Sequence, residues 1–174
     1  MLWHKRIGIS RLRGFVTLLP LLLLTGCLHP LYAGGENGLI ADQLRAIQIM
    51  PIGQRIGHYI ETELTFQLNG TGSHVTPRYK LVVTPYEGNS TPLVDTVTGM
   101  TTASTVTTVA TYELTSLETG KVIAHGKVFV SATYDRTSQR FSDMRAARDA
   151  EQRDARSLAD QIRTQVAAAL TSQT

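Results

Sequence analysis

The sequence is short of the residues from which most active sites and metal sites are built. It has one cysteine among 174 residues, so no disulfide forms within the chain, and a cysteine-rich metal cluster or CxxC redox motif is excluded. Its five histidines show none of the HxH, HxxxH or HExxH spacings of zinc ligands. A GxSxG nucleophile motif is also lacking. We therefore expect no catalytic residue, no bound metal and no cofactor, and interpret the chain as a non-enzyme.

Excess charge is also lacking from most of the chain. Only 18% of the residues are charged, and the formal net charge is +3. Four of the seventeen Lys and Arg residues lie before residue 27, where no Asp or Glu occurs, so the remaining thirteen face fourteen acidic residues. Because nucleic-acid binding by bulk charge needs a clear positive excess, the composition excludes it.

The amino-terminal stretch has the pattern of an export signal. Its basic residues precede an apolar run from Phe15 to Leu24, which is about half of the roughly 20 residues that a membrane-spanning helix needs. We predict a cleaved signal peptide over residues 1–26. The run ends in Leu24-Thr25-Gly26-Cys27, which resembles the lipobox of bacterial lipoproteins.

The lipobox gives the lone cysteine a role. Cys27 is predicted to carry the S-diacylglycerol and N-palmitoyl groups that anchor such proteins to a membrane, with residues 27–44 forming the lipidated cysteine and its tether. The plainer alternative is that Cys27 is an ordinary small residue near a signal-peptidase cleavage point. Leu28, rather than Asp, after the cysteine implies the outer membrane by the sorting rule for these proteins, with the domain on the periplasmic side.

Residues 45–170 are predicted to form a single α+β domain. Hydrophobic periodicity and turn residues give the order strand, helix, strand, strand, strand, helix. A right-handed crossover through the first helix makes the first two strands parallel, and a hairpin at Glu118-Thr119-Gly120-Lys121 makes the last two antiparallel. We expect a mixed four-stranded sheet with two helices packed on one face, as a two-layer sandwich. The elements are expected at residues 46–52, 54–68, 79–86, 101–117, 122–134 and 142–170.

Local signals refine these boundaries. Asn69-Gly70 predicts a left-handed stop for the first helix. Pro85 late in the second strand favours an edge position or a bulge, and Gly88, Asn89 and Pro92 predict a turn-rich passage after it. The third strand is rich in threonine on one face only, so the sheet should have one dry face and one polar face. The predicted dry face of this strand comprises Val106, Thr108, Ala110, Tyr112 and Leu114.

One charged residue breaks the pattern of the last helix. Extending its apolar stripe backwards at about 100° per residue places Met144, Arg148 and Glu151 in line with the buried positions. A charge cannot lie unpaired against a dry sheet, so either the first two turns project beyond the sheet or Arg148 meets a polar ligand. The plainer interpretation is an exposed ion pair between Arg148 and Glu151 at i, i+3.

The mature chain resembles the LptE family, the lipopolysaccharide-assembly lipoproteins of Gram-negative outer membranes. The likeness lies in the lipobox followed by Leu28-His29-Pro30-Leu31-Tyr32, in the order of strands and helices, and in the closing segment at residues 146–152 that leads into residues 158–162. It implies a subunit that plugs the β-barrel LptD, assists assembly of that barrel, and contacts lipopolysaccharide. A polar sheet face suits a polar barrel interior.

The resemblance also implies a role for Arg148, because members carry a basic residue linked to lipopolysaccharide contact near the start of the last helix. A guanidinium can bind a lipid A phosphate bidentately. The other basic position of the family aligns near Gly99 and Met100, which are uncharged. Alternative phosphate contacts are the strand and turn residues Arg78, Lys80, Lys121 and Lys127.

Two further functions compete with the barrel plug. The chief alternative is a freestanding periplasmic lipid-binding lipoprotein that carries an amphiphile in an apolar cavity. A more distant one is a lipoprotein that tethers other envelope components. A barrel that co-purifies in stoichiometric amount distinguishes the plug from the lipid carrier.

Overall fold

The computed structural model describes residues 38–70, 72, 75–94 and 101–172. The predicted signal peptide, Cys27 and the residues that follow it up to 37 lie outside the described part, as do Gly99 and Met100. The elements in chain order are α2 (Leu39–Arg45), β1 (Ile47–Ile49), α3 (Gln54–Asn69), β2 (Tyr79–Val94), β3 (Thr101–Ser116), β4 (Val122–Asp135) and α4 (Arg140–Thr171).

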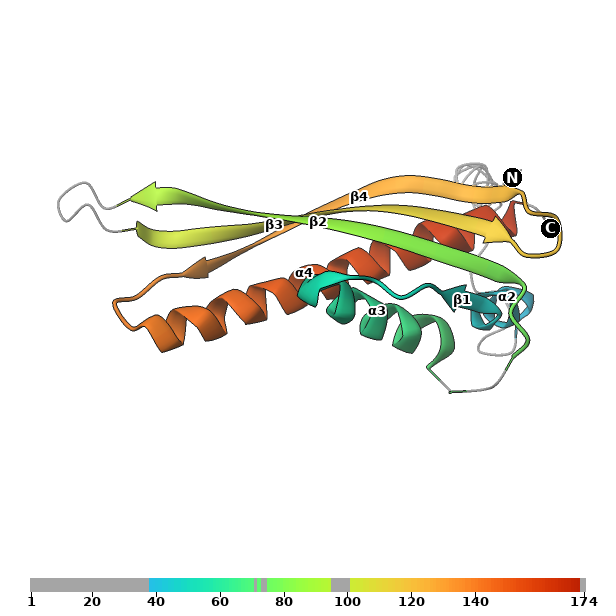
Figure 1. Cartoon of the computed structure of the whole chain (residues 1–174), viewed down its shortest axis with the longest axis horizontal. Coiled ribbons are helices and arrows are strands. Elements are labelled where there is room, and N and C mark those ends of the chain that lie inside the picture. The colour runs from blue at the N-terminus through green and yellow to red at the C-terminus, as the bar shows by residue number, and fades with distance from the viewer. Residues whose placement is uncertain (1–37, 71, 73–74, 95–100, 173–174) are drawn as a thin grey trace, which may run out of the picture.

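The sheet has the order β1-β2-β3-β4, with β1 parallel to β2 and the other pairs antiparallel. The described helices all lie on one face of it (Figure 1). The predicted α+β architecture is therefore confirmed, with a mixed four-stranded sheet and two main helices on the same side. One helix was not predicted: α2 occupies residues assigned from the sequence to the tether and buries Leu44.

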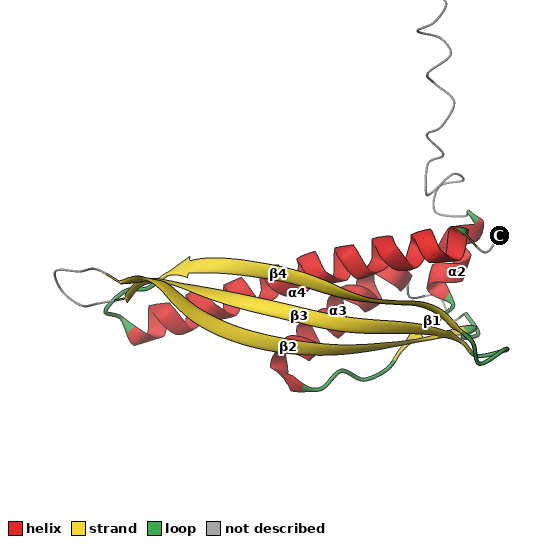
Figure 2. Ribbon diagram, turned by 90° about the horizontal axis from the view of Figure 1, so that it is seen from above, coloured by secondary structure: helices red, strands yellow, loops and turns green. Residues whose placement is uncertain are grey.

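The molecule is elongated along its strands and along α4. Seen from above, the sheet runs parallel to the long helix (Figure 2). At 32 residues, α4 is about 48 Å long. The carboxyl end of α4 lies with α2 at one end of the molecule, and the start of α4 lies at the other end (Figure 1). Residues in the first turns of α4 are thus far from the end at which the described chain begins.

The core lies between the helical layer and the inner face of the sheet. Each main helix buries one stripe at helical spacing, as the sequence predicts. Alanines contribute much of the α4 stripe, so this helix can approach the sheet closely. The buried residues of the two stripes are Ile56, Gly57, Ile60, Leu64 and Leu68 on α3, and Ala150, Glu151, Asp154, Ala155, Leu158, Ala159, Ile162, Val166, Ala167 and Leu170 on α4.

The two faces of β3 differ as predicted. All five residues of its predicted dry face are buried, and the alternate residues from Thr105 to Thr115 are half-buried or exposed. Hydroxyls on the outer face bond to one another across strands, as between Thr105 Oγ1 and Thr133 Oγ1 at 2.9 Å. The sheet therefore has one face covered by helices and one face that no described element covers.

β2 is longer than predicted. The passage containing Gly88 and Asn89 continues the strand instead of forming a turn, because it keeps antiparallel register with Thr107 and Val106 of β3. Register shifts on either side of Leu93 accommodate the irregular end of the strand. The prediction of an edge position for Pro85 is confirmed: β1 pairs with β2 only as far as Leu81, so β2 beyond it pairs on one side with β3.

The predicted stop of α3 is wrong in its geometry. Gly70 follows the helix with φ −59° and ψ −18°, a right-handed conformation, and the positive φ of 64° occurs instead at Gly72. The start of α4 also differs from the prediction. It begins at Arg140, and Asp143 in its first turn accepts a hydrogen bond of 2.7 Å from the backbone N–H of Thr137.

Candidate functional site

The first ten residues of α4, Arg140 to Asp149, form an exposed end of the helix. None of them is buried, whereas Ala150 is fully buried against Val106 and Ala132. The sequence-based expectation that these turns project beyond the sheet is wrong: they lie level with the far ends of β2, β3 and β4 and diverge from the sheet (Figure 1). The alternative, that Arg148 meets a polar ligand, stays a prediction. The exposed end offers its side chains to solvent or to a partner.

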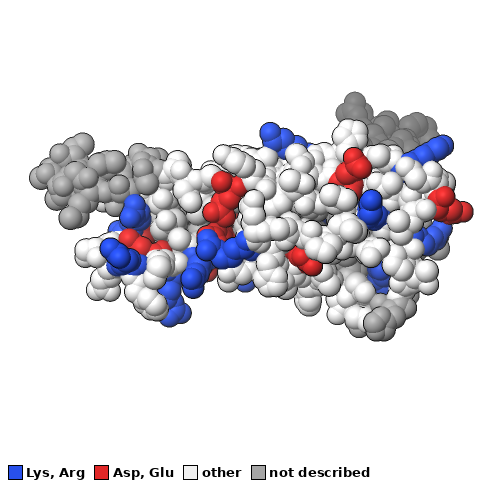
Figure 3. Space-filling view, viewed as in Figure 1, with Lys and Arg blue, Asp and Glu red and all other residues white. Residues whose placement is uncertain are grey.

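Arg148 lies on this exposed end in a surface depression, where Phe141, Met144 and Arg145 also contribute to the lining. We call these four residues the α4 basic surface. The Arg145 guanidinium carbon lies 6.0 Å from the centre of the Phe141 ring, which is within reach of a cation–π interaction. Figure 3 shows Lys and Arg side chains gathered over this part of the molecule. Cations beside exposed apolar groups suit an anion that also carries apolar groups better than a small hydrophilic anion.

Glu151 is not the partner of Arg148, so the predicted i, i+3 ion pair is wrong. Glu151 is only 4% exposed, and its carboxylate accepts two hydrogen bonds from Arg55 at the start of α3, with Nε to Oε2 at 2.8 Å and the second from Nη2 to Oε1. Arg148 is exposed, and no hydrogen bond or ion pair joins its side chain to another residue of the described part. The guanidinium of Arg148 is thus available for an outside ligand.

Two more acids lie next to Glu151, beneath the exposed end. Asp154 is 2% exposed and accepts a hydrogen bond of 3.1 Å from the hydroxyl of the fully buried Thr108. Burial raises the pKa of Asp154, although Thr108 and the charge of Arg153 oppose the rise. Burial also raises the pKa of Glu87, with a further rise from the negative charge of Glu151. This cluster therefore holds three carboxyl groups, on Glu87, Glu151 and Asp154, and one guanidinium, that of Arg55, which is bonded to Glu151.

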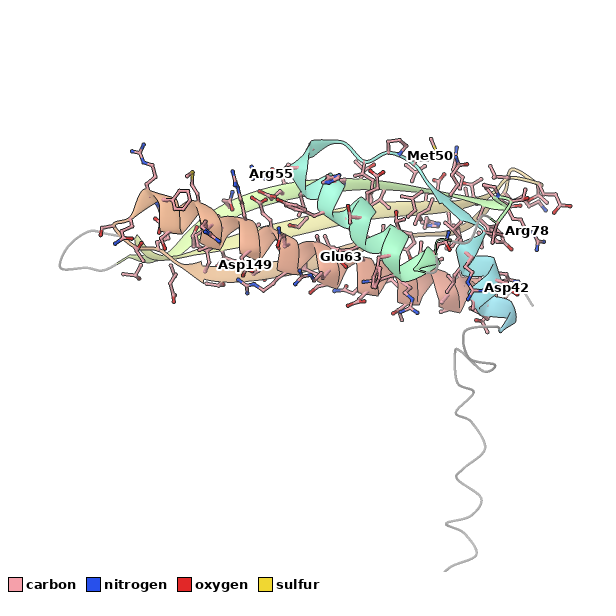
Figure 4. All side chains as sticks on the ribbon, turned by 90° about the horizontal axis from the view of Figure 1, so that it is seen from below. Asp42, Met50, Arg55, Glu63, Arg78 and Asp149 are labelled. Carbon is pink, nitrogen blue, oxygen red and sulfur yellow. The ribbon has the colours of Figure 1, made fainter. Side chains whose placement is uncertain are left out.

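A second interhelical ion pair joins α3 to α4 about two turns further along α3 and about one and a half turns further along α4. Arg156 Nε lies 3.2 Å from Glu63 Oε1. Figure 4 labels Arg55 and Glu63 along α3, beside α4. Glu61 turns the other way and accepts a hydrogen bond of 3.1 Å from the backbone N–H of Ile52. Glu61 and Glu63 therefore have different partners and do not act together.

The start of α3 is held in an unusual conformation that places Arg55. Gln54 has φ +70°, in the left-handed region that residues other than glycine seldom adopt. The Glu61 bond to Ile52 and the burial of Ile56 fix the chain on either side. This turn directs the Arg55 side chain toward Glu151. The ion pair between them lies at the point where the exposed first turns of α4 meet the core.

Sequence reasoning missed Arg55, Glu87 and Asp154 as members of this cluster. The only signal was that Glu151 lies on the apolar stripe of its helix, where an acid needs a partner. Nothing in the sequence identified that partner, because Arg55 is 96 residues away. Within the described part of the chain, no group of three or more His, Cys, Asp or Glu residues is arranged to hold a metal ion.

Arg55→Met should destabilise the fold because it leaves the buried Glu151 carboxylate without its cation. We expect the free energy of unfolding to fall by about 2 kcal/mol, less than for a fully enclosed pair because Arg55 is itself more than a third exposed. The double variant Arg55→Met/Glu151→Met should recover most of the loss. Urea unfolding measures both, and equal instability of the single and double variants would contradict the assignment.

Asp154→Asn should be more stable than the natural chain at neutral pH. A carboxyl whose pKa is raised on folding binds its proton more readily in the folded state, so its contribution is complete below the ordinary value of 3.8 and is lost as pH rises through the folded value. The advantage of the asparagine should therefore shrink between about pH 7 and about pH 4. Urea midpoints at the two pH values measure it.

The exposed Asp160 on the same helix provides the control, because its replacement by Asn removes a charge already in water. That variant should match the natural chain at both pH values. A gain for Asp154→Asn that is independent of pH would show that burial of the charge is not the cause.

Comparison with known proteins places this fold among bacterial lipoproteins. The putative lipoprotein from Caulobacter crescentus CB15 superposes with a TM-score of 0.63 at 19% identity, over 76% of this chain and 96% of that one. The rare lipoprotein B from Shewanella oneidensis gives 0.56 at 11% identity, over 73% and 97%. The minor lipoprotein from Acinetobacter baumannii gives 0.53 at 17% identity, over 71% and 92%. These identities show a shared fold.

No curated protein matches the sequence. No helix in the described ranges is both long and apolar enough to cross a membrane. The model of the lipopolysaccharide-assembly family LptE matches residues 44–166, which include β1 to β4, α3 and all of α4 except its last turns. The match covers more than half of the chain, and it contains every residue of the α4 basic surface and of the acid cluster beneath it. The chain therefore belongs to the LptE family of lipopolysaccharide-assembly proteins.

Proposed function

We propose that this chain is an outer-membrane lipoprotein that plugs the LptD β-barrel, assists assembly of that barrel, and contacts lipopolysaccharide through Arg148. Family membership supports a part in lipopolysaccharide assembly. The observation that carries the plug role is the shape of the domain. It is a rod about 48 Å long, longer than the roughly 30 Å hydrocarbon core of a bilayer. One face of its sheet is rich in threonine, and no described element covers it (Figure 1).

The proposed lipid anchor and the α4 basic surface lie toward opposite ends of the domain. Acyl groups on Cys27 would hold the chain at the periplasmic leaflet of the outer membrane, and ten residues separate Cys27 from Gly38, where the described part begins. Such a segment spans at most about 35 Å. Because α2 lies at one end of the rod and the start of α4 at the other (Figure 1), the α4 basic surface lies at the end away from the anchor.

The freestanding lipid carrier is less well supported. A carrier needs an apolar cavity large enough for acyl chains, and the space between sheet and helices here is filled by residues with almost no exposure, including Leu81, Leu114, Leu158 and Ile162. The surface depression at Arg148 is lined instead by a mixture of basic, acidic and apolar residues. An amphiphile can touch such a surface with its headgroup and cannot be enclosed by it.

The plug role is tested by affinity purification of the full-length lipoprotein from detergent-extracted membranes of its source bacterium. The LptD barrel, identified by mass spectrometry, should co-purify in equimolar amount, because a plug and its barrel form one stoichiometric complex. Depletion of the chain should lower the amounts of mature barrel and of surface lipopolysaccharide. Recovery of bound lipid without the barrel, together with normal barrel levels after depletion, would favour the lipid carrier.

Arg148→Glu should weaken binding of lipopolysaccharide by the purified full-length protein by about tenfold or more, since a charge-assisted hydrogen bond is lost and a repulsive charge is introduced. Arg148→Lys should lose less, because it keeps the charge without the bidentate geometry. Surface plasmon resonance on immobilised lipopolysaccharide measures the affinities.

Lys121→Glu provides the matched comparison, because it makes the same change of charge in the exposed turn between β3 and β4. Lipopolysaccharide affinity should stay within about twofold of the natural protein if the contact involves the α4 surface, because screening confines an exposed charge to roughly 10 Å. Loss of affinity in Lys121→Glu and not in Arg148→Glu would move the contact to the strand and turn residues.

A further inference from the structure

An aromatic row crosses the uncovered face of the sheet. Tyr86 on β2 is in register with Val109 on β3, and Val109 with Phe129 on β4. Their sequence neighbours Pro85, Ala110 and Val128 are buried on the helix side, so the three side chains of the row point to the opposite face. Tyr86 is 74% exposed and Phe129 is 60% exposed. Two large aromatic side chains thus stand in solvent at the same level of the sheet.

The rows on either side lack large apolar side chains and consist of threonine, serine, glycine and one lysine. Towards one end of the strands, Thr84 is in register with Thr111, and Thr111 with Lys127. Towards the other end, Gly88 is in register with Thr107, and Thr107 with Ser131. The aromatic row therefore stands above a polar surface, as the central aromatic anchors of protein interfaces do within a polar rim.

We infer that this open face, centred on the row Tyr86–Val109–Phe129, is the surface by which the chain packs against the polar inner wall of a transmembrane β-barrel. The inference rests on the proposed plug function and adds that the sheet layer, and not the helical layer, contacts the barrel wall. The helical layer would then face the space left within the barrel.

The area of the face approaches that of a stable interface. β4 has 14 residues and β2 and β3 have 16 each, so three strands about 48 Å long at a spacing of about 4.8 Å present roughly 700 Å². A stable interface of standard size buries about 800 Å² on each partner. The open face alone nearly reaches this value.

The chemistry of the face selects the wall of a barrel over other occupants. A permanent dimer of this chain would require a more apolar face, resembling a core cut in half. Insertion into hydrocarbon would bury the threonine hydroxyls and Lys127 without hydrogen-bond partners, at a cost of several kcal/mol for each unsatisfied group. The lumen wall of a barrel carries polar side chains that can bond to these hydroxyls while the aromatic row fills gaps between them.

The test is the double variant Tyr86→Ser/Phe129→Ser, expressed as the full-length lipoprotein in its source bacterium. Its matched control is Phe66→Ser, which removes an aromatic residue that is 70% exposed on α3, in the helical layer. Co-purified barrel should fall about tenfold or more in the double variant, because central aromatic residues supply much of the energy of an interface. It should be unchanged in the control. Circular dichroism melting confirms that both variants fold.

A second measurement does not depend on the loss of binding. A photoreactive phenylalanine analogue placed at position 129 should crosslink to the barrel, and the same analogue at position 66 should not. Crosslinking at 66 in place of 129, with the natural chain still binding the barrel, would overturn the open face and leave the plug function standing. Failure of the natural chain to co-purify any barrel would overturn both. A crosslinked dimer of this chain through position 129 would assign the face to a second copy.

Discussion

The helices of this domain pack against one face of its sheet and leave the other face open (Figures 1 and 2). The stripe of α4 is rich in alanines that are completely buried, among them Ala150, Ala155, Ala159 and Ala167, so the helix lies close against β3 and β4 along most of its length. Together with α3 it covers the inner face of the sheet and no part of the outer one (Figures 1 and 2). A two-layer domain of this kind leaves its second sheet face open, and threonine side chains on that face can hydrogen-bond to water or to a polar partner.

The order of the elements could be predicted from the sequence because it depends on local periodicity. The alternation in β3 and the stripe of α4 each repeat often enough to show which face is buried. The length of β2 could not be predicted in this way, because Gly88, Asn89 and Pro92 are turn residues locally. Pairing with β3 keeps the first two within the strand. The prediction of a left-handed stop at Gly70 was wrong because a glycine permits a left-handed conformation without requiring it.

The candidate site shows the same limit more sharply. Periodicity alone placed Arg148 and Glu151 on the apolar stripe. It left open whether Arg148 pairs with Glu151 or meets an outside ligand. The structure separates the two residues at the point where the core ends, so that Glu151 turns inward to Arg55 while Arg148 stays outside. Neither the Arg55 partner nor the bond between Thr108 and Asp154 could be inferred, because contacts between α3, β3 and α4 join residues that are distant in the sequence.

The proposed barrel interface and the proposed lipid contact make different demands, and they lie on different layers of this domain. The open face is broad and polar, and hydrogen-bonded strands hold its side chains in register, which suits a fixed interface. The α4 basic surface lies on exposed turns of the helix, where Arg148 has no ion-pair partner among the described residues and would be open to the proposed phosphate contact. The Arg55–Glu151 pair lies beneath this end of α4 and fixes where the helix departs from the sheet. On this proposal, a change in the side chains of the α4 basic surface need not disturb an interface on the open face of the sheet.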